Sequence, residues 1–230
     1  MADSYLVKIK LDKSIDKVEE IMKIIPAWRR EKAIKFCNKS DQVRCIMAYL
    51  LIAHVVRLNT NDNVSLLDME FSFEEFGKPK LVFPKGYYVN ISHSGEWVAC
   101  VIDKRPVGID IEQIKSLNID IAKKFFTSIE STYINKQTIG MQGKAFCKLW
   151  AIKESYVKAL GNGMYKPFNT FQVDFRKDND VNIVEFENIT EKFNVKYFEV
   201  DSKYILAVTA NSNISIPIYI DEKLIEGEFL

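Results

Sequence analysis

The chain has 230 residues, of which 47% are hydrophobic and 12% aromatic, so it can bury a sizeable core in one large domain or two small ones. Its formal net charge is only +1, which argues against a global attraction to nucleic acid or to a membrane surface. Any functional charge must therefore be local.

The cysteines and the N-terminal sequence favour a reducing compartment. There is no C-x-x-C pair among the four cysteines, Cys37, Cys45, Cys100 and Cys147. The first ten residues do not resemble a signal peptide, and the longest apolar stretch, residues 46–56, is too short to cross a bilayer. We therefore expect a soluble cytoplasmic protein.

In the first half, alternating residues predict a strand over residues 6–11, and helical spacing predicts a helix over residues 15–25. Pro26 is placed to open a second helix. Asp41 is a suitable N-cap for a long third helix. His54 falls among the apolar positions of that helix, which indicates a packed, hydrogen-bonded core residue.

The remaining elements repeat the order of helices followed by strands. Four strands are predicted after the long helix, over residues 69–73, 87–92, 97–103 and 107–112, the last of them just beyond the join between the halves. Helices over residues 118–126 and 144–160 follow, and then strands over residues 170–175, 181–186, 195–200, 204–210 and 215–220. This order predicts an α+β fold with two similarly built subdomains, residues 1–105 and 106–230, packed closely together.

Two carboxylates lie close together in a predicted strand. In the sequence P-V-G-I-D-I-E, Asp110 and Glu112 share one face and Ile109 and Ile111 share the other. An edge strand with a wet polar face would show the same pattern. A face that holds a cation is the alternative.

The helix over residues 144–160 offers a third carboxylate. Trp150, Glu154 and Lys158 are spaced i, i+4, i+8 and line one side. Glu154 and Lys158 could form only a plain stabilising ion pair. If Glu154 packs beside Asp110 and Glu112, however, the three form an all-oxygen site suited to Mg²⁺ or Mn²⁺, and Lys158 could meet the charge of a phosphate.

Further basic groups could bind a phosphate-bearing ligand or form a solvated helix face. They are Arg29, Arg30, Lys32, Lys35, Lys39 and Arg44, with Lys78 in a glycine–proline turn. His93, in N-I-S-H-S-G, is predicted at the end of a strand, where functional residues are common.

Together, the motifs R-R-E-K, F-G-K-P, N-I-S-H-S-G-E-W-V, V-G-I-D-I-E and L-W-A-I-K-E-S-Y-V-K-A-L-G-N-G resemble the Sfp-type (surfactin synthetase-activating) phosphopantetheinyl transferases. The resemblance runs from about Pro26 to Met164. It implies a monomeric pseudodimer of two α+β units. It also implies transfer of 4′-phosphopantetheine from coenzyme A to a serine of an acyl or peptidyl carrier protein, with release of adenosine 3′,5′-bisphosphate.

The resemblance also implies residue roles. Asp110, Glu112 and Glu154 look like Mg²⁺ ligands, and Glu154 also looks like the group that takes the proton from the carrier serine. Lys158 and His93 would bind the diphosphate. The remaining implied contacts are to the coenzyme A 3′-phosphate from Arg29, Lys32 and Arg44, and to the adenine nucleotide end from Lys78 and Ser92.

Two residues depart from the family pattern: Cys45 stands where relatives often have a hydroxyl, and Arg29 replaces a common lysine. The carrier is predicted to dock on residues 119–126, where Lys123 and Lys124 could meet an acidic carrier face or simply be solvated.

Two other functions fit some of these features. A Mg²⁺-dependent nuclease would also use strand carboxylates and a lysine, but it should show a basic face, which the near-zero net charge disfavours. A non-catalytic module that binds coenzyme A or a carrier should have lost a ligand or the helix lysine, and all of them are present.

Overall fold

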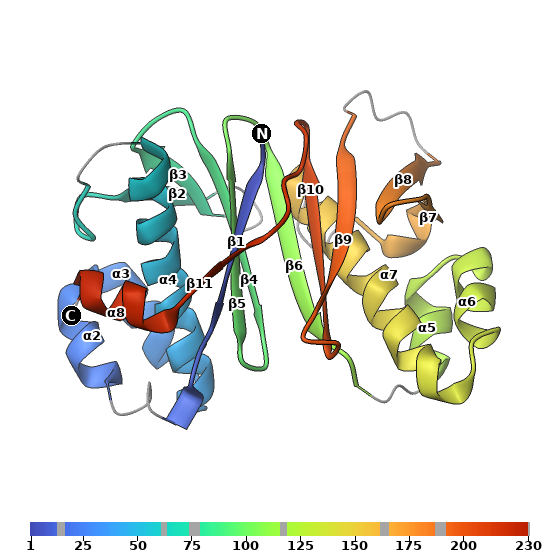
Figure 1. Cartoon of the computed structure of the whole chain (residues 1–230), viewed down its shortest axis with the longest axis horizontal. Helices are drawn as coiled ribbons and strands as arrows, with labels where there is room; N and C mark the ends of the chain where they lie inside the picture. Colours follow the sequence, from blue (N-terminus) through green and yellow to red (C-terminus); the bar gives the residue numbers. More distant parts are fainter. Residues whose placement is uncertain are drawn as a thin grey trace.

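The structure, a computed structural model, describes residues 1–12, 17–60, 64–73, 79–115, 119–161, 166–186 and 192–229. Two β-sheets pack face to face at its centre, and helices cover their outer faces (Figure 1). The first sheet contains, in order, β11 (Ile218–Ile220), β1 (Asp3–Lys8), β5 (Trp97–Asp103) and β4 (Tyr88–Ser94). The second contains β6 (Val107–Gln113), β10 (Tyr204–Ala210), β9 (Asn194–Val200), β8 (Asp180–Glu185) and β7 (Phe171–Phe175). A separate hairpin is formed by β2 (Glu70–Phe73) and β3 (Pro79–Phe83).

The central strands are buried on both faces because each face contributes to a different core. In β5, Val98, Cys100 and Ile102 pack in the core under the first-half helices, whereas Ala99 and Val101 pack in the core between the two sheets. Strand β10 divides its side chains in the same way. The nearly continuous apolar sequences of these strands follow from this two-sided burial.

One long helix lies on each sheet. The first sheet is covered by α4 (Lys39–Thr60), with α2 (Val18–Ile24), α3 (Ala27–Ile34) and α8 (Glu222–Phe229) nearby (Figure 1). The second is covered by α7 (Ile139–Leu160), accompanied by α5 (Ile119–Phe125), α6 (Ser128–Asn135) and the 3₁₀ turn η2 (Phe168–Thr170). The fold is therefore α+β and consists of two such halves, packed against each other through their sheets, as predicted.

The chain passes from the first sheet to the second between Asp103 and Val107, close to the predicted join. Its C-terminal segment then returns to the first half. Strand β11 pairs in parallel with β1, with Ile218 opposite Tyr5, and α8 packs against α4 (Figure 1). Residues 218–229, which the sequence analysis grouped with the second half, thus pack on the first half.

Helix α4 is long and apolar enough to cross a membrane by length and composition, but 72% of its apolar window is buried inside the protein. His54, in this helix, is 6% exposed, and its Nδ1 contacts Glu228 of α8. The prediction that His54 is a packed, hydrogen-bonded core residue is confirmed. The burial of α4 is typical of a core helix.

Some predicted helix boundaries were wrong. Helix α4 begins at Lys39, not after Asp41, and the Asn38 side chain accepts a hydrogen bond from the Ser40 N–H at 2.9 Å. Asp41 lies in the first turn and pairs with Arg44 at 2.7 Å. Asn38 therefore has the capping role that was predicted for Asp41.

Candidate functional site

Asp110 and Glu112 lie on the face of β6 that is turned toward α7. Ile109, on the opposite face, is part of the core between the sheets. Gly108 lies directly below α7, where a Cβ atom would be only 1.9 Å from the Ser155 carbonyl oxygen. The absence of a side chain at Gly108 therefore allows α7 to approach the carboxylate-bearing strand closely.

Lys158 of α7 connects the helix to this strand. Its Nζ forms an ion pair with Asp110 Oδ1 at 2.6 Å and donates a hydrogen bond to the Ile109 carbonyl oxygen at 3.2 Å. Among the described contacts, Lys158 pairs with Asp110 and not with Glu154. Burial lowers the pKa of Lys158, but Asp110, followed by Glu154 and Glu112, more than offsets this, so the net shift is upward. Lys158 is therefore held charged beside the carboxylates.

The three predicted carboxylates influence one another. Asp110 is 4% exposed, and its Oδ2 is buried without a hydrogen-bond partner among the described residues. Burial, followed by the charge of Asp110, raises the pKa of Glu112 to about 7. Burial also raises the pKa of Glu154, which Lys158 partly opposes and Asp110 reinforces. The single positive charge of Lys158 therefore offsets only part of the free-energy cost of burying these carboxylates.

These residues fit a divalent cation in their chemistry. Their oxygen donors suit Mg²⁺ or Mn²⁺. The unpartnered Asp110 Oδ2 is an acceptor that a cation would satisfy. The described residues nevertheless include no three ligand groups already gathered for a metal ion.

Two serines of β4 hold the carboxylates from the other half of the molecule. Ser92 Oγ donates to Asp110 Oδ1 at 2.8 Å, and Ser94 Oγ donates to Glu112 Oε2 at 3.3 Å. Ser92 thus contacts a carboxylate, and its contact with the nucleotide stays a prediction. Ser94 was not among the predicted site residues. The alternation in N-I-S-H-S, which places both serines on one strand face, could have identified it.

His93 lies on the opposite face of β4, near α4, and is partly buried. Burial lowers its pKa to about 4, with further lowering from Arg44 and Lys158. Arg44 pairs with Asp41 and also donates to the Gly95 carbonyl oxygen at 2.8 Å. An uncharged imidazole is therefore held near two cations, an arrangement that suits the arrival of an anion.

Two of the predicted phosphate contacts, Arg29 and Lys32, differ in their exposure. Lys32 is exposed, but Arg29 is only 4% exposed, and its guanidinium donates to the Cys45 carbonyl oxygen. Arg29 also lies over the rings of Trp28 and Tyr49, at 5.9 and 5.8 Å from their centroids. Burial lowers the pKa of Arg29.

Arg29 is therefore mostly enclosed within the first half and contacts a backbone carbonyl there. Its Nε has no hydrogen-bond partner among the described residues, and no carboxylate among them contributes to the pKa shift of Arg29 or of Lys32. Two neighbouring cations without a recorded counterion are consistent with an anion site. Lys78, the other predicted nucleotide contact, lies outside the described residues.

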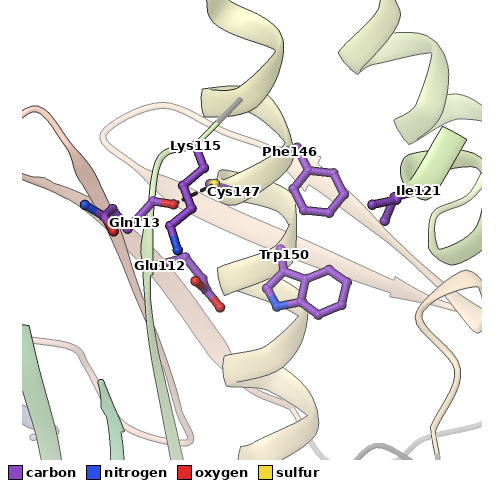
Figure 2. Close-up of a pocket in the computed structure, with 7 residues that line it drawn as sticks. All are labelled: Glu112, Gln113, Lys115, Ile121, Phe146, Cys147 and Trp150. Carbon is purple, nitrogen blue, oxygen red and sulfur yellow. Dashed lines mark hydrogen bonds between the residues drawn. The ribbon is translucent and has the colours of Figure 1, made fainter. Parts of the chain in front are cut away.

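A pocket of about 330 Å³ opens beside Glu112. Figure 2 shows the Glu112 carboxylate at one side, Phe146 and Trp150 projecting from α7, and Ile121 facing them from α5. Cys147 also lines the pocket, and its thiol contacts the Gln113 carbonyl oxygen at 3.5 Å. The carboxylate site is thus continuous with a largely apolar pocket between α5 and α7.

Comparison with known proteins identifies the family. Residues 106–209 match the family model of the 4′-phosphopantetheinyl transferase superfamily. The chain is 35% identical to 4′-phosphopantetheinyl transferase Sfp of Bacillus subtilis (strain 168) over 192 residues, which cover 84% of each protein. It is 39% identical over 147 residues to 4′-phosphopantetheinyl transferase gsp of Aneurinibacillus migulanus, covering 64% of this chain and 60% of that protein. The chain belongs to the 4′-phosphopantetheinyl transferase superfamily.

Proposed function

We propose that this enzyme transfers 4′-phosphopantetheine from coenzyme A to a carrier-protein serine at the site formed by β4, β6 and α7, with Asp110, Glu112 and Glu154 as ligands of Mg²⁺ or Mn²⁺. The observation that carries the proposal is the buried, unpartnered oxygen of Asp110 among these carboxylates. The two relatives compared above are named as 4′-phosphopantetheinyl transferases, which favours this function over a nuclease or a non-catalytic binding module.

The reaction joins the serine oxygen to the β-phosphorus of coenzyme A. The bond from that phosphorus to the bridging oxygen breaks, and adenosine 3′,5′-bisphosphate leaves with this oxygen. When bound, the divalent cation neutralises charge on the diphosphate oxygens. Positioning and charge neutralisation supply most of the rate enhancement in reactions of this type.

Glu154 accepts the serine proton, directly or through a water molecule. In the metal-free enzyme, burial raises the pKa of Glu154, so its carboxylate readily takes up a proton. Lys158 and His93 bind the diphosphate and stabilise the charge of the departing bisphosphate. None of the four cysteines is required as a nucleophile.

The pocket of Figure 2 accommodates the pantetheine arm. It begins at Glu112, and its apolar wall of Ile121, Phe146 and Trp150 suits the largely uncharged arm. The nucleotide end would extend in the other direction, toward Arg44 and Lys32. The carrier would approach over α5, where Lys123 and Lys124 are exposed, and docking there stays a prediction. The enzyme acts as a cytoplasmic monomer in this proposal.

The transfer is tested by the intact mass of an apo carrier protein after incubation with the enzyme, coenzyme A and Mg²⁺. We expect a mass gain of one phosphopantetheine group, and no gain when EDTA replaces Mg²⁺. Full transfer in EDTA would refute the metal requirement. No transfer to any of several unrelated carriers would refute the proposed reaction.

Replacing Lys32 with alanine should weaken recognition of the 3′-phosphate. A charge-assisted hydrogen bond contributes about 1.5–3 kcal/mol, so the KM for coenzyme A should rise at least about 10-fold. The KM for 3′-dephospho-coenzyme A should not change. Steady-state kinetics with both substrates test this, and Lys35→Ala, at the end of the same helix, is the matched control. An equal rise for both substrates would contradict a 3′-phosphate contact.

His93 should take up a proton when coenzyme A binds below about pH 6. Its pKa in the free enzyme is about 4, so the imidazole is neutral there, and the nearby diphosphate charge should raise this pKa on binding. Calorimetric titrations in two buffers of different ionisation enthalpy measure the uptake. His93→Gln should bind with less proton uptake than the wild type, and identical uptake by the two proteins would place the diphosphate away from His93.

The same pKa shift affects stability. Because the folded pKa of His93 lies below its unfolded value of about 6.5, the folded state binds fewer protons between these values. The contribution of His93 to stability is therefore present above about pH 6.5 and is lost as the pH falls toward 4.

A further inference from the structure

A buried ion pair lies behind the carboxylate site, on the side of α7 that faces the core. Lys153 is 0% exposed, and its Nζ forms an ion pair with Glu130 Oε1 of α6 at 2.8 Å. The same Nζ donates to the carbonyl oxygens of Phe168 at 2.7 Å and Phe171 at 2.6 Å. An ammonium group has three N–H donors, so all of those on Lys153 have acceptors.

Both carboxylate oxygens of Glu130 also have hydrogen-bond partners. Glu130 is 2% exposed, and its Oε1 also accepts a hydrogen bond from the Val173 N–H at 2.8 Å. Its Oε2 accepts from the Thr127 N–H at 3.0 Å, which completes the capping box at the start of α6. The pair therefore connects α6, α7, η2 and β7 through hydrogen bonds without an unpartnered atom.

Stability alone does not account for such a pair. The desolvation cost of two buried charges often equals or exceeds their attraction, and well-packed apolar replacements can be as stable or more stable. Burial is in fact strong enough to lower the pKa of Lys153 to about 8 despite the nearby Glu130. What the pair does provide is one defined arrangement of the elements that it joins.

The position of Lys153 gives that arrangement a functional consequence. The next residue of α7 is Glu154, and Lys158 follows one turn later. Beyond Gly161, where α7 ends in a left-handed conformation, the chain returns to place Phe168 and Phe171 against Lys153. Lys153 precedes Glu154 and Lys158 in the chain, and its two carbonyl partners follow them. Lys153 therefore fixes the helix relative to the segment that comes after the proposed catalytic residues.

We propose that the Lys153–Glu130 pair is a positioning device, which sets the rotation of α7 and thereby aims Glu154 and Lys158 at the reacting groups. The inference rests on the proposed function. Neither Lys153 nor Glu130 touches the substrate, so loss of the pair should affect the chemical step more than the binding of coenzyme A.

The test compares Lys153→Met, Glu130→Gln and the double variant with the wild type. Each single variant leaves one buried polar group without its partner and should lower the Tm. The double variant removes both charges and should recover most of the Tm. Its kcat for carrier modification should still be about 10- to 100-fold below that of the wild type, because a misplacement of about 1 Å can cost this much. Its KM for coenzyme A should remain within about twofold.

Lys166→Met is the matched control. Lys166 is also buried, at 8% exposure, and forms an ion pair with Glu185 at 3.1 Å, but it lies outside α7. Its kcat should remain near that of the wild type.

A double variant with recovered Tm and wild-type kcat would overturn the inference. If the double variant does not fold, Glu130→Gln, which preserves the side-chain shape, gives the result: a wild-type kcat in that variant would also overturn it. Absence of transfer by the wild type itself would instead refute the proposed function.

Discussion

Replacing Glu154 with glutamine should lower kcat for carrier modification by about 10³-fold. Loss of a general base alone typically costs about 10²- to 10⁴-fold, and this substitution also removes a proposed metal ligand. In the absence of metal, the substitution should not lower the stability of the folded protein, because burial and Asp110 already disfavour the charge on Glu154. The measurement is single-turnover transfer at saturating coenzyme A, together with the Tm in EDTA.

Glu199→Gln provides the control for this substitution. Glu199 lies on β9 and pairs with Lys144 of α7 at 2.7 Å, but it is exposed and outside the site. It should change kcat by less than about twofold, as expected for a surface ion pair. A Glu154→Gln enzyme with at least a tenth of the wild-type kcat would show that another group accepts the proton.

Replacing Gly108 with alanine should separate α7 from β6. The added Cβ would lie 1.9 Å from the Ser155 carbonyl oxygen and 2.6 Å from the Ala159 nitrogen, and both are backbone atoms with little freedom to move. Overpacking of this kind costs about 3 kcal/mol, or roughly 6–12 °C in Tm for a chain of this size. Because Glu154 and Lys158 are carried by α7, kcat should also fall by about 100-fold.

Gly140→Ala tests whether the effect is specific to this contact. Gly140 lies in the first turn of the same α7, and a Cβ there would meet nothing within 4 Å. This substitution should leave kcat unchanged and maintain or slightly raise the Tm, since alanine favours a helix. Equal, small effects of the two substitutions would mean that α7 does not depend on close packing at Gly108.

The sequence was most informative where a pattern is set by local geometry. Alternation placed Asp110 and Glu112 on one face of β6, and the structure confirms that face as the one toward α7. Helical spacing likewise identified α7 and its carboxylate, although the helix begins at Ile139 rather than at residue 144. These features depend on neighbours in sequence and are therefore readable from it.

Contacts between segments that are distant in the sequence were harder to predict. The choice of Asp110 as the partner of Lys158 depends on packing between β6 and α7, whereas the sequence offered Glu154 as the nearest carboxylate. Burial of Arg29 depends on the packing of α3 against α4, so a basic residue predicted as a phosphate contact proved to be enclosed. The return of residues 218–229 to the first half is also set by long-range pairing.

Helix α6 could have been predicted from a local sequence pattern. Helix α6 was not predicted, yet Thr127 and Glu130 form a capping box, and the T-S-I-E sequence carries its pattern. Recognition of that box would have located the helix. It would not have revealed that Glu130 also binds Lys153, because that contact depends on tertiary packing.

The most direct test of the account is a titration with Mn²⁺, monitored by electron paramagnetic resonance in the presence of coenzyme A. We expect one bound Mn²⁺ per chain in the wild type and binding at least about 10-fold weaker in Asp110→Asn, which lacks the charge that would contact the cation. The Glu199→Gln enzyme should bind as the wild type does. Wild-type affinity in Asp110→Asn would contradict the proposed role of the β6 and α7 carboxylates as the metal site.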